Sequence, residues 1–447
     1  MVTESLTMTP QAEAKLAETK PGGGAAASPR LMSVDALRGF DMFWIIGADS
    51  LVYALNQMSQ TAPTKFLAGQ LKHADWQGFH FYDLIFPLFV FIAGVALVFS
   101  LTKAIERAGR TEALKRVFWR SLLLFLAGLF YSGGLTNRWP DIRLMGVLNR
   151  IALAYFFTGL LFCFFKPRAL AAIGVSILAG YWALMTFVPI RDMQLTRGHM
   201  AELATQAGDE ETAAFYRNED SPNPSAVKNS RAWAAAERLF YATTNRVTGK
   251  FDKGLNLADH LDFQYLPGRK YDTFFDPEGY LSTLPAVVTC LLGVFAGLLL
   301  RNQAVPDGRK VLWLVGGGVG AAALGWLWGL QFPVIKKIWT SSYVLVAGGY
   351  SAILLGLFYL VVEVWQARGW CQPFVWMGMN SITIYLASNV LGDFSTLAVR
   401  FAGGDVRAWF DEHLAQGLGD LLVSALGLWL AFWFVRFLYR RKIFLRL

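Results

Sequence analysis

A histidine and a carboxylate stand close together at the start of one apolar run. The stretch "KHADWQGFHFYDLIFPLFVFIAG", residues 72–94, places His73 and Asp83 beside a sequence apolar enough to enter a bilayer. Histidine serves as nucleophile or proton carrier near neutral pH, and a neighbouring carboxylate can fix its tautomer. Asp49, Asp75 and Asp83 are all candidates for that carboxylate, and their spacing does not choose among them. The stretch therefore indicates a centre for nucleophilic or proton-transfer chemistry.

A structural interpretation of the same residues stays open. His73 can be an interfacial histidine that hydrogen-bonds a main-chain carbonyl, and Trp76 can belong to the aromatic belt of a membrane protein. Taken alone, Trp76 fits the belt better than a site.

Further polar residues lie inside apolar runs, where ionisable groups are expensive and default to functional hypotheses. They occur in "SVDALRGFDMFWIIGADSL", "LMGVLNRIALAYF" and "WMGMNSITIYL", and comprise Asp35, Arg38, Asp41, Asp49, Asn149, Arg150, Asn380 and Ser381. The alternative is that they pair with one another, for instance Arg150 with Asp49 or Asp83, to hold helices together. Together they are too many for packing alone.

The elements that carry these residues are membrane helices. Of 447 residues, 55% are hydrophobic and 16% charged, far from a soluble globular average. Runs of about 20 apolar residues predict an all-α polytopic membrane protein with about ten transmembrane helices. They lie near 39–56, 79–101, 117–135, 144–165, 169–190, 281–300, 311–331, 342–364, 373–392 and 418–438.

Orientation and domain organisation follow from the distribution of Lys and Arg. Their excess falls on loops that share the side of the N-terminus, which predicts that both termini are cytoplasmic. We expect a disordered cytoplasmic tail over 1–30, five spans over 31–190, an extracytoplasmic helical cap over 191–280, and five spans with a basic cytoplasmic C-terminus over 281–447. In the cap, 198–219 and 230–247 each read as a short helix.

The scattered cysteines and histidines predict neither a disulfide framework nor a metal site. Cys163, Cys290 and Cys371 lie in or beside predicted spans, and the five histidines show no metal-ligand spacing. The net charge of +9 is explained by the cytoplasmic bias, so no nucleic-acid partner is expected.

Several motifs together resemble the heparan-α-glucosaminide N-acetyltransferase family and its bacterial relatives. "SVDALRG", "HADWQGFHFYDLIFPLFVFIAGVAL", "GVLNRIALAY", "LPGRKYDTFFDPEGYLSTLPAVVTCLLGVFAG", "KKIWTSSYVL" and "GMNSITIYL" occur in the expected order. The resemblance runs from about residue 31 to 392, and six ordered blocks make it specific.

The resemblance implies an enzyme that takes acetyl from cytosolic acetyl-CoA and delivers it to a glucosamine amino group on the far side. The family's His-x-x-Trp-x-Gly motif is His73 to Gly78 here, which implies that His73 is the active-site histidine. Two departures matter: Asp49 stands where animal members carry asparagine, and Asn149 where they carry glutamine. We also expect no counterpart in this chain of the animal members' luminal N-terminal domain and leading helix.

From the six motif blocks and the chemistry of individual side chains we assign roles in acetyl transfer. His73 is general base or transient acetyl carrier, with direct transfer slightly favoured, and the catalytic set is His73, Asp49 and Asp83. The acetyl-CoA set is Asp35, Arg38, Asn149, Arg150, Asn380 and Ser381, with the inner cations Lys115, Arg116 and Arg120 also available. The substrate set is Trp76, Asp276, Glu278, Trp339 and Ser341, and no metal is assigned.

Structural alternatives stay open for part of the substrate set. Pro277 and Gly279 suit a tight turn into the following helix, where Glu278 would face a positive N-terminus. Ser341 and Ser342 suit a helix cap, although Asn380, Ser381 and residues 339–342 are also candidates for stabilising an oxyanion.

The partners expected are the lipid bilayer and an amino-sugar or glycan acceptor, and a homodimer is one state considered. Localisation in a bacterial cytoplasmic (inner) membrane fits the basic inner loops. The main rival is a transporter or flippase for a polar lipid or glycan that uses the buried charges as a proton relay. It predicts inverted repeats, and residues 31–190 and 281–438 show no clear repeat.

Overall fold

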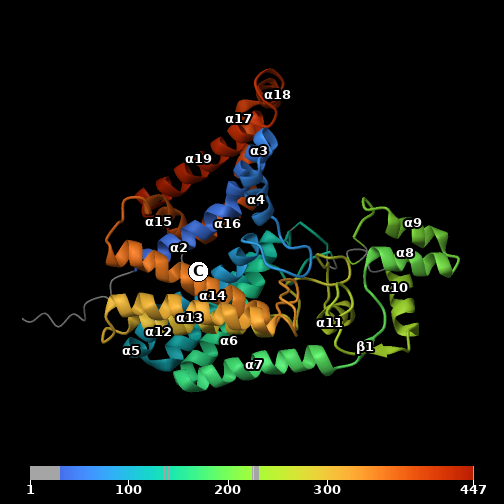
Figure 1. Cartoon of the computed structure of the whole chain (residues 1–447), viewed down its shortest axis with the longest axis horizontal. Coiled ribbons are helices and arrows are strands. Elements are labelled where there is room, and N and C mark those ends of the chain that lie inside the picture. The colour runs from blue at the N-terminus through green and yellow to red at the C-terminus, as the bar shows by residue number, and fades with distance from the viewer. Residues whose placement is uncertain (1–30, 135, 139–140, 224, 226–230, 446–447) are drawn as a thin grey trace, which may run out of the picture. The chain divides into compact units, whose positions relative to one another are not determined.

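The computed structural model describes residues 31–134, 136–138, 141–223, 225 and 231–445, so the expected tail over 1–30 lies outside the described residues. The described chain is built of helices, and its only named strands are the two-residue β1 (Ile190–Arg191) and β2 (Arg246–Val247). The all-α fold class expected from the sequence is confirmed (Figure 1).

Seven helices among the described residues are long and apolar enough to cross a membrane, or eight if one bent pair is a single span. This makes the chain a polytopic membrane protein, but it does not confirm a count of ten. The difference lies partly in α5 (Tyr82–Tyr131), which contains both expected spans 79–101 and 117–135. The two halves of α5 meet at Gly109, whose φ of 80° is a conformation that glycine adopts without strain.

Broken helices account for the rest of the difference. The expected first span is divided into α2 (Met32–Phe43), the π-helical turn η1 (Trp44–Ala48) and α3 (Asp49–Ser59), and α4 (Ala62–Gln70) follows. The expected ninth span is divided at Asn380 into α15 (Gln372–Met379) and α16 (Ser381–Leu391). The bent pair combines α16 with α17 (Phe394–Ala402), at an angle of 51°.

Helices α2 and α15 touch backbone to backbone. A Cβ atom on Gly39 would lie 1.7 Å from the carbonyl oxygen of Phe374, and one on Gly378 would lie 1.9 Å from that of Asp35. Glycine is required at both positions because any side chain would force the helices apart. This contact fixes the start of α2, which carries Asp35 and Arg38.

The remaining long helices complete the membrane bundle. They are α6 (Val147–Phe164), α7 (Pro167–Phe187), α12 (Thr283–Arg301), α13 (Asp307–Trp328), α14 (Ser341–Tyr359) with its π-helical end η3 (Leu360–Val364), and α19 (Leu418–Arg440). A buried apolar cluster joins α5, α6 and α12, with Leu97, Tyr155 and Val294 among its members. The short α18 (Gly404–His413) precedes α19.

Residues 191–280 form helices rather than an open loop. They contain α8 (Arg197–Gln206), α9 (Glu210–Arg217), α10 (Arg231–Ala242) and α11 (Leu257–Tyr265), and β1 pairs antiparallel with β2. Figure 1 shows α8, α9 and α10 grouped beside β1. The single helix expected over 198–219 is wrong: it is two helices, because Gly208 between them has a φ of 73°. The helix expected over 230–247 ends at Ala242, and its last residues form β2.

Candidate active site

The loop that carries His73 is tied to the first turn of α5 by Asp83. One carboxylate oxygen of Asp83, Oδ2, accepts the main-chain N–H groups of Ala74 (3.1 Å) and His80 (3.0 Å). The other, Oδ1, lies 2.9 Å from His73 Nδ1. The Asp83 side chain is 1% exposed and that of His73 is 51% exposed. Asp83 therefore orients an accessible imidazole from a buried position.

Of the three carboxylates that the sequence leaves open, the structure brings only Asp83 into contact with His73. Asp49 begins α3, where its Oδ1 accepts the N–H of Ser50 at 2.9 Å. Its Oδ2 accepts the hydroxyl of Tyr82 at 3.4 Å, and the Tyr82 ring packs 4.9 Å from the His73 ring. Asp49 thus reaches the histidine only through Tyr82, and Asp75 is exposed.

A lysine that the sequence interpretation missed lies beside the pair. Lys336, in the segment between α13 and α14, has its Nζ 2.9 Å from His73 Nδ1, 3.3 Å from His73 Nε2 and 3.4 Å from Asp83 Oδ1. Burial lowers the pKa of Lys336, although the Asp83 carboxylate opposes that shift. The available signal was a lysine pair, 336–337, on the side where the positive-inside pattern predicts few cations.

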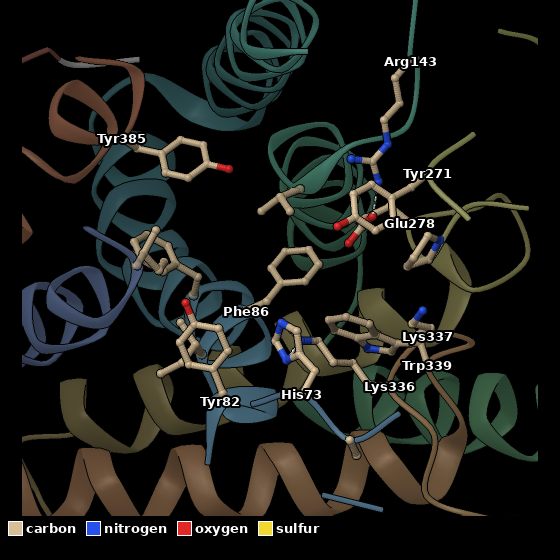
Figure 2. A pocket seen from close by; sticks show the side chains of 16 residues that line it. His73, Tyr82, Phe86, Arg143, Tyr271, Glu278, Lys336, Lys337, Trp339 and Tyr385 are labelled. Atoms are coloured by element: carbon tan, nitrogen blue, oxygen red, sulfur yellow. Dashed lines mark hydrogen bonds and ion pairs between the residues drawn. The ribbon is translucent and has the colours of Figure 1, made fainter. Parts of the chain in front are cut away.

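These side chains border a cavity of about 310 Å³. Figure 2 shows His73, Lys336 and Trp339 on one side of it and Arg143, Tyr271 and Glu278 on another, with Tyr385 facing them. The remaining lining is mostly apolar and comprises Ile45, Ala74, Tyr82, Ile85, Phe86, Phe89, Val147, Pro277 and Lys337. A cavity with an apolar wall and a few convergent polar groups is the usual form of a small-molecule site.

Arg143 holds the turn that forms the far wall. Its Nε and Nη2 donate to the two oxygens of Asp276 at 2.8 and 2.7 Å, and Nη2 also donates to Glu278 at 2.5 Å. Burial alone would lower the pKa of Arg143, but the two carboxylates outweigh it and raise the pKa. Burial raises the pKa of Glu278 even though Arg143 counteracts it. The guanidinium also lies 4.9 Å from the Tyr271 ring centroid.

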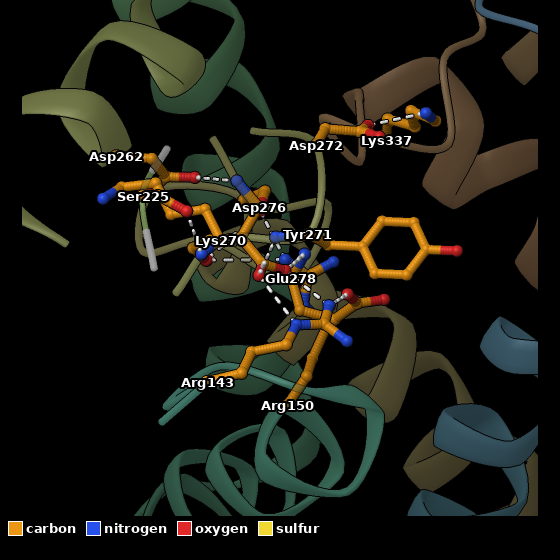
Figure 3. Close-up of polar contacts among 12 residues, drawn as sticks. Arg143, Arg150, Ser225, Asp262, Lys270, Tyr271, Asp272, Asp276, Glu278 and Lys337 are labelled. Carbon is orange, nitrogen blue, oxygen red and sulfur yellow. Dashed lines mark hydrogen bonds and ion pairs between the residues drawn. The ribbon is translucent and has the colours of Figure 1, made fainter. Parts of the chain in front are cut away.

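Arg150 supports the same turn from α6, as Figure 3 shows. Its Nη2 donates to the hydroxyl of Ser282 and to the carbonyl of Gly279 (3.4 Å), and its guanidinium lies 4.8 Å from the Trp339 ring centroid. Asp262 of α11 accepts the N–H groups of Tyr280 (3.0 Å) and Asp276 (3.3 Å) from the other side. The turn is therefore clamped between α6 and α11.

The residues assigned to acetyl-CoA from the sequence do not form one cluster. Arg38 pairs with Asp35 at 3.3 Å and approaches the Gly378 carbonyl at 3.5 Å, close to Asn380 and Ser381 at the break between α15 and α16. Arg150 instead contacts Gly279, Ser282 and the ring of Trp339, and the adjacent Asn149 donates to the Phe125 carbonyl at 3.0 Å. Their role in binding acetyl-CoA stays a prediction.

Two members of the substrate set point elsewhere than the cavity. Trp76 donates its ring N–H to the Phe251 carbonyl at 2.7 Å and packs against the apolar cluster of the 191–280 segment. Ser341 donates to the Leu178 carbonyl at 2.8 Å, and the residue that caps α14 is Thr340 rather than either serine. Asp276, Glu278 and Trp339, by contrast, lie in or directly behind the cavity wall.

Comparisons with known proteins agree with the motifs in the sequence. The family model described as "Heparan-alpha-glucosaminide N-acetyltransferase, catalytic" matches residues 30–205, which include the His73 loop and Asp83. The chain is 26% identical over 462 residues to heparan-alpha-glucosaminide N-acetyltransferase of Homo sapiens, covering 94% of this chain and 60% of the relative. It is 27% identical over 394 residues to that of Mus musculus, covering 83% and 56%. The chain thus spans under two thirds of these relatives, and the resemblance is confirmed.

Proposed function

We propose that this chain, which resembles the heparan-α-glucosaminide N-acetyltransferase family, is a membrane-bound N-acetyltransferase. Its donor is acetyl-CoA, and its acceptor is the amino group of a glucosamine-like sugar or glycan. The observation that carries the proposal is the His73–Asp83 pair, with Nδ1 and Oδ1 2.9 Å apart, at the edge of a cavity. A histidine whose Nδ1–H donates to a carboxylate presents Nε2 as a base or nucleophile.

The cavity fits the acyl end of the donor. A volume of about 310 Å³ is enough for an acetyl thioester and part of a pantetheine arm, and the apolar side chains of Ile45, Ile85 and Phe89 suit that arm. A sugar acceptor would approach from the side of Arg143 and Glu278, beside the exposed ring of Tyr271. This arrangement brings donor and acceptor together at His73.

Direct transfer is the simplest chemistry for these groups. The acceptor nitrogen attacks the thioester carbon, His73 Nε2 takes the proton from that nitrogen, the C–S bond breaks, and the imidazolium returns the proton to the leaving thiolate. Asp83 holds the ring and stabilises the imidazolium meanwhile. Attack by Nε2 itself, which would form an acetyl-histidine, uses the same geometry. Asp49 acts on the ring only through Tyr82.

The location of the reaction is part of the proposal. We place both termini in the cytoplasm of a bacterium, with His73 and residues 191–280 on the outer side of its inner membrane, because the positive-inside pattern supports that orientation. A tag inserted at Asp220, which is exposed, is then accessible in intact cells. A tag that reacts only after permeabilisation contradicts this orientation.

The test is acetylation of glucosamine by detergent-purified protein supplied with acetyl-CoA, comparing wild type with His73→Ala and Asp49→Asn. We expect transfer by wild type, none by His73→Ala, and a smaller defect in Asp49→Asn because Asp49 lacks direct contact with the ring. Binding of acetyl-CoA without transfer would refute the acceptor, and failure to bind acetyl-CoA would refute the proposal. In that last case flux of a polar lipid or glycan into proteoliposomes should be measured.

A further inference from the structure

Of the described cations that line the cavity, Lys336 is the one in contact with His73, and the backbone around it fixes its position. The segment that carries Lys336 is pinned to the His73 loop, because the Gly78 N–H donates to the Val334 carbonyl at 2.9 Å and Gln77 bridges to Ile335. Within the segment, the Ile335 N–H donates to the Thr340 hydroxyl at 3.1 Å. The lysine therefore approaches the imidazole from a rigid support.

The hydrogen atoms around His73 Nδ1 can be arranged in only one way that satisfies Asp83. Nδ1 cannot both donate to Asp83 and accept from Lys336, although both lie 2.9 Å away. If Nδ1–H donates to the carboxylate, the ammonium pairs with Asp83 at 3.4 Å, can donate a second N–H to Nε2 at 3.3 Å, and keeps its third N–H for another acceptor. Because Nζ is this close to Nε2, an acceptor bound to the ammonium would lie beside Nε2, where a reacting group would also lie.

Most of the donors that the sequence suggested for stabilising an oxyanion already donate to other groups, and Ser381 is not among the residues that line the cavity. Asn380 donates its amide to the Trp376 carbonyl at 3.2 Å, and the Trp339 ring N–H donates to Thr289 at 3.1 Å. The hydroxyls of Ser341 and Ser342 donate to the main-chain carbonyls of Leu178 and Phe332 at 2.8 and 2.6 Å. Among the described residues, Lys336 is thus the donor best placed beside the histidine.

We propose that Lys336 is a catalytic residue that donates a hydrogen bond to the thioester carbonyl oxygen as negative charge develops on it. The inference rests on the proposed acetyl transfer. As the acceptor nitrogen bonds to the carbonyl carbon, the C=O π electrons move to the oxygen, where the ammonium stabilises them. When the C=O bond re-forms, the C–S bond breaks and the thiolate takes the proton held by His73. Lys336 keeps its own protons throughout.

The test compares Lys336→Met and Lys336→Arg in the glucosamine acetylation assay. Methionine keeps most of the length of the side chain without its charge. We therefore expect kcat to fall about 10²- to 10³-fold, the loss typical of one oxyanion donor, with the KM for acetyl-CoA changed less than about threefold. Arginine keeps the charge and should restore at least about a tenth of wild-type kcat. Lys310→Met is the matched control, since it also breaks an ion pair (Lys310–Asp307, 3.0 Å), and it should keep wild-type kcat.

Each outcome bears on the inference. If wild type transfers acetyl and Lys336→Met keeps more than about a tenth of its kcat, Lys336 is not the donor. If Met and Arg variants lose activity equally and both melt at lower temperature, the lysine only supports the fold and the inference is wrong. Should Lys336→Met not purify, Lys336→Gln takes its place under the same criteria. A wild type that transfers nothing refutes the proposed function itself, and the role of Lys336 with it.

Discussion

Removing Arg143 should destabilise the protein in a way that depends on pH. The Arg143 side chain is 14% exposed, and its two partners, Asp276 and Glu278, are 0% and 11% exposed. Truncating one partner of a buried, hydrogen-bonded ion pair costs about 3–5 kcal/mol because the remaining charge is left uncompensated. Arg143 pairs with two carboxylates, but Asp276 keeps the main-chain N–H donors of Tyr271 (3.1 Å) and Glu278 (3.0 Å) when the guanidinium is removed. Arg143→Met should therefore lower the free energy of unfolding by about the cost of one broken pair rather than two.

The sign of the pH dependence follows from Glu278. Burial already raises its pKa, and Arg143 is the main group that counteracts this, so the substitution raises the pKa further. A carboxyl whose folded pKa lies above its unfolded pKa contributes stability below the unfolded value and loses it as pH rises. Arg143→Met should therefore be more destabilised, relative to wild type, at pH 8 than at pH 5.5.

The assay can use the protein's own thiols. Cys163, Cys290 and Cys371 are free and buried, so a thiol-reactive fluorophore reports unfolding of detergent-purified protein on heating. The matched variant is Arg143→Met with Glu278→Gln, which removes the orphaned charge and should recover part of the loss, mainly at pH 8. A single variant that melts like wild type, or equally far below it at both pH values, would refute the reasoning.

Three further results are expected. His260 is buried with a pKa lowered to about 4 from 6.5, so its contribution to stability is complete above pH 6.5 and is lost as pH falls towards 4. The melting temperature of His260→Gln should therefore fall less than that of wild type when pH is lowered from 7.5 to 5. The pKa of Asp262 is raised to about 7, so that residue gains stability as pH falls, but it does so equally in both proteins. Gly39→Ala should prevent α2 from packing on α15, seen as loss of the monodisperse peak in gel filtration, and a normal peak would contradict the backbone contact. Asp83→Asn should lower kcat by about 10²- to 10⁴-fold, because the tautomer of His73 is no longer fixed; an unchanged kcat would exclude Asp83 as its orienter.

Spacing in the sequence indicated a contact in the candidate site only where the two residues are close together in the chain, whereas Asp276, Glu278 and Trp339 were assigned from the motif blocks. His73 and Asp83 are ten residues apart, and the structure places them in contact. Lys336 is 263 residues from His73, and Arg143 is 133 from Asp276. Hydropathy and charge patterns assign residues to a side of the membrane but do not show which loops contact one another. From the sequence, Lys336 and Arg143 were therefore recognised only as charged residues of short outer loops.

The same reason explains which helices were predicted well. Long apolar runs predicted the positions of α6, α7, α12, α13, α14 and α19, because a helix that crosses a membrane needs about 20 consecutive apolar residues. Breaks inside apolar runs were missed at Gly47 and Asn380, where apolar composition continues while the backbone turns. At Gly109 the opposite holds: the charged residues 102–116 separated two expected spans, but α5 continues through them and turns only at Gly109. Gly47 and Gly109 adopt φ values of 121° and 80°, a region of backbone conformation that hydropathy does not report.

The distance in sequence between His73 and Lys336 also has a meaning for synthesis. A nascent chain leaves the ribosome from its N-terminus, so the imidazole and its carboxylate emerge long before the lysine that completes the site. The chain gains the full set of reacting groups proposed above only once α13 and the segment after it have been inserted. Two polypeptides divided in the connection at 302–306 and translated together should reassemble a protein active in the glucosamine acetylation assay, whereas the first polypeptide alone should show no transfer.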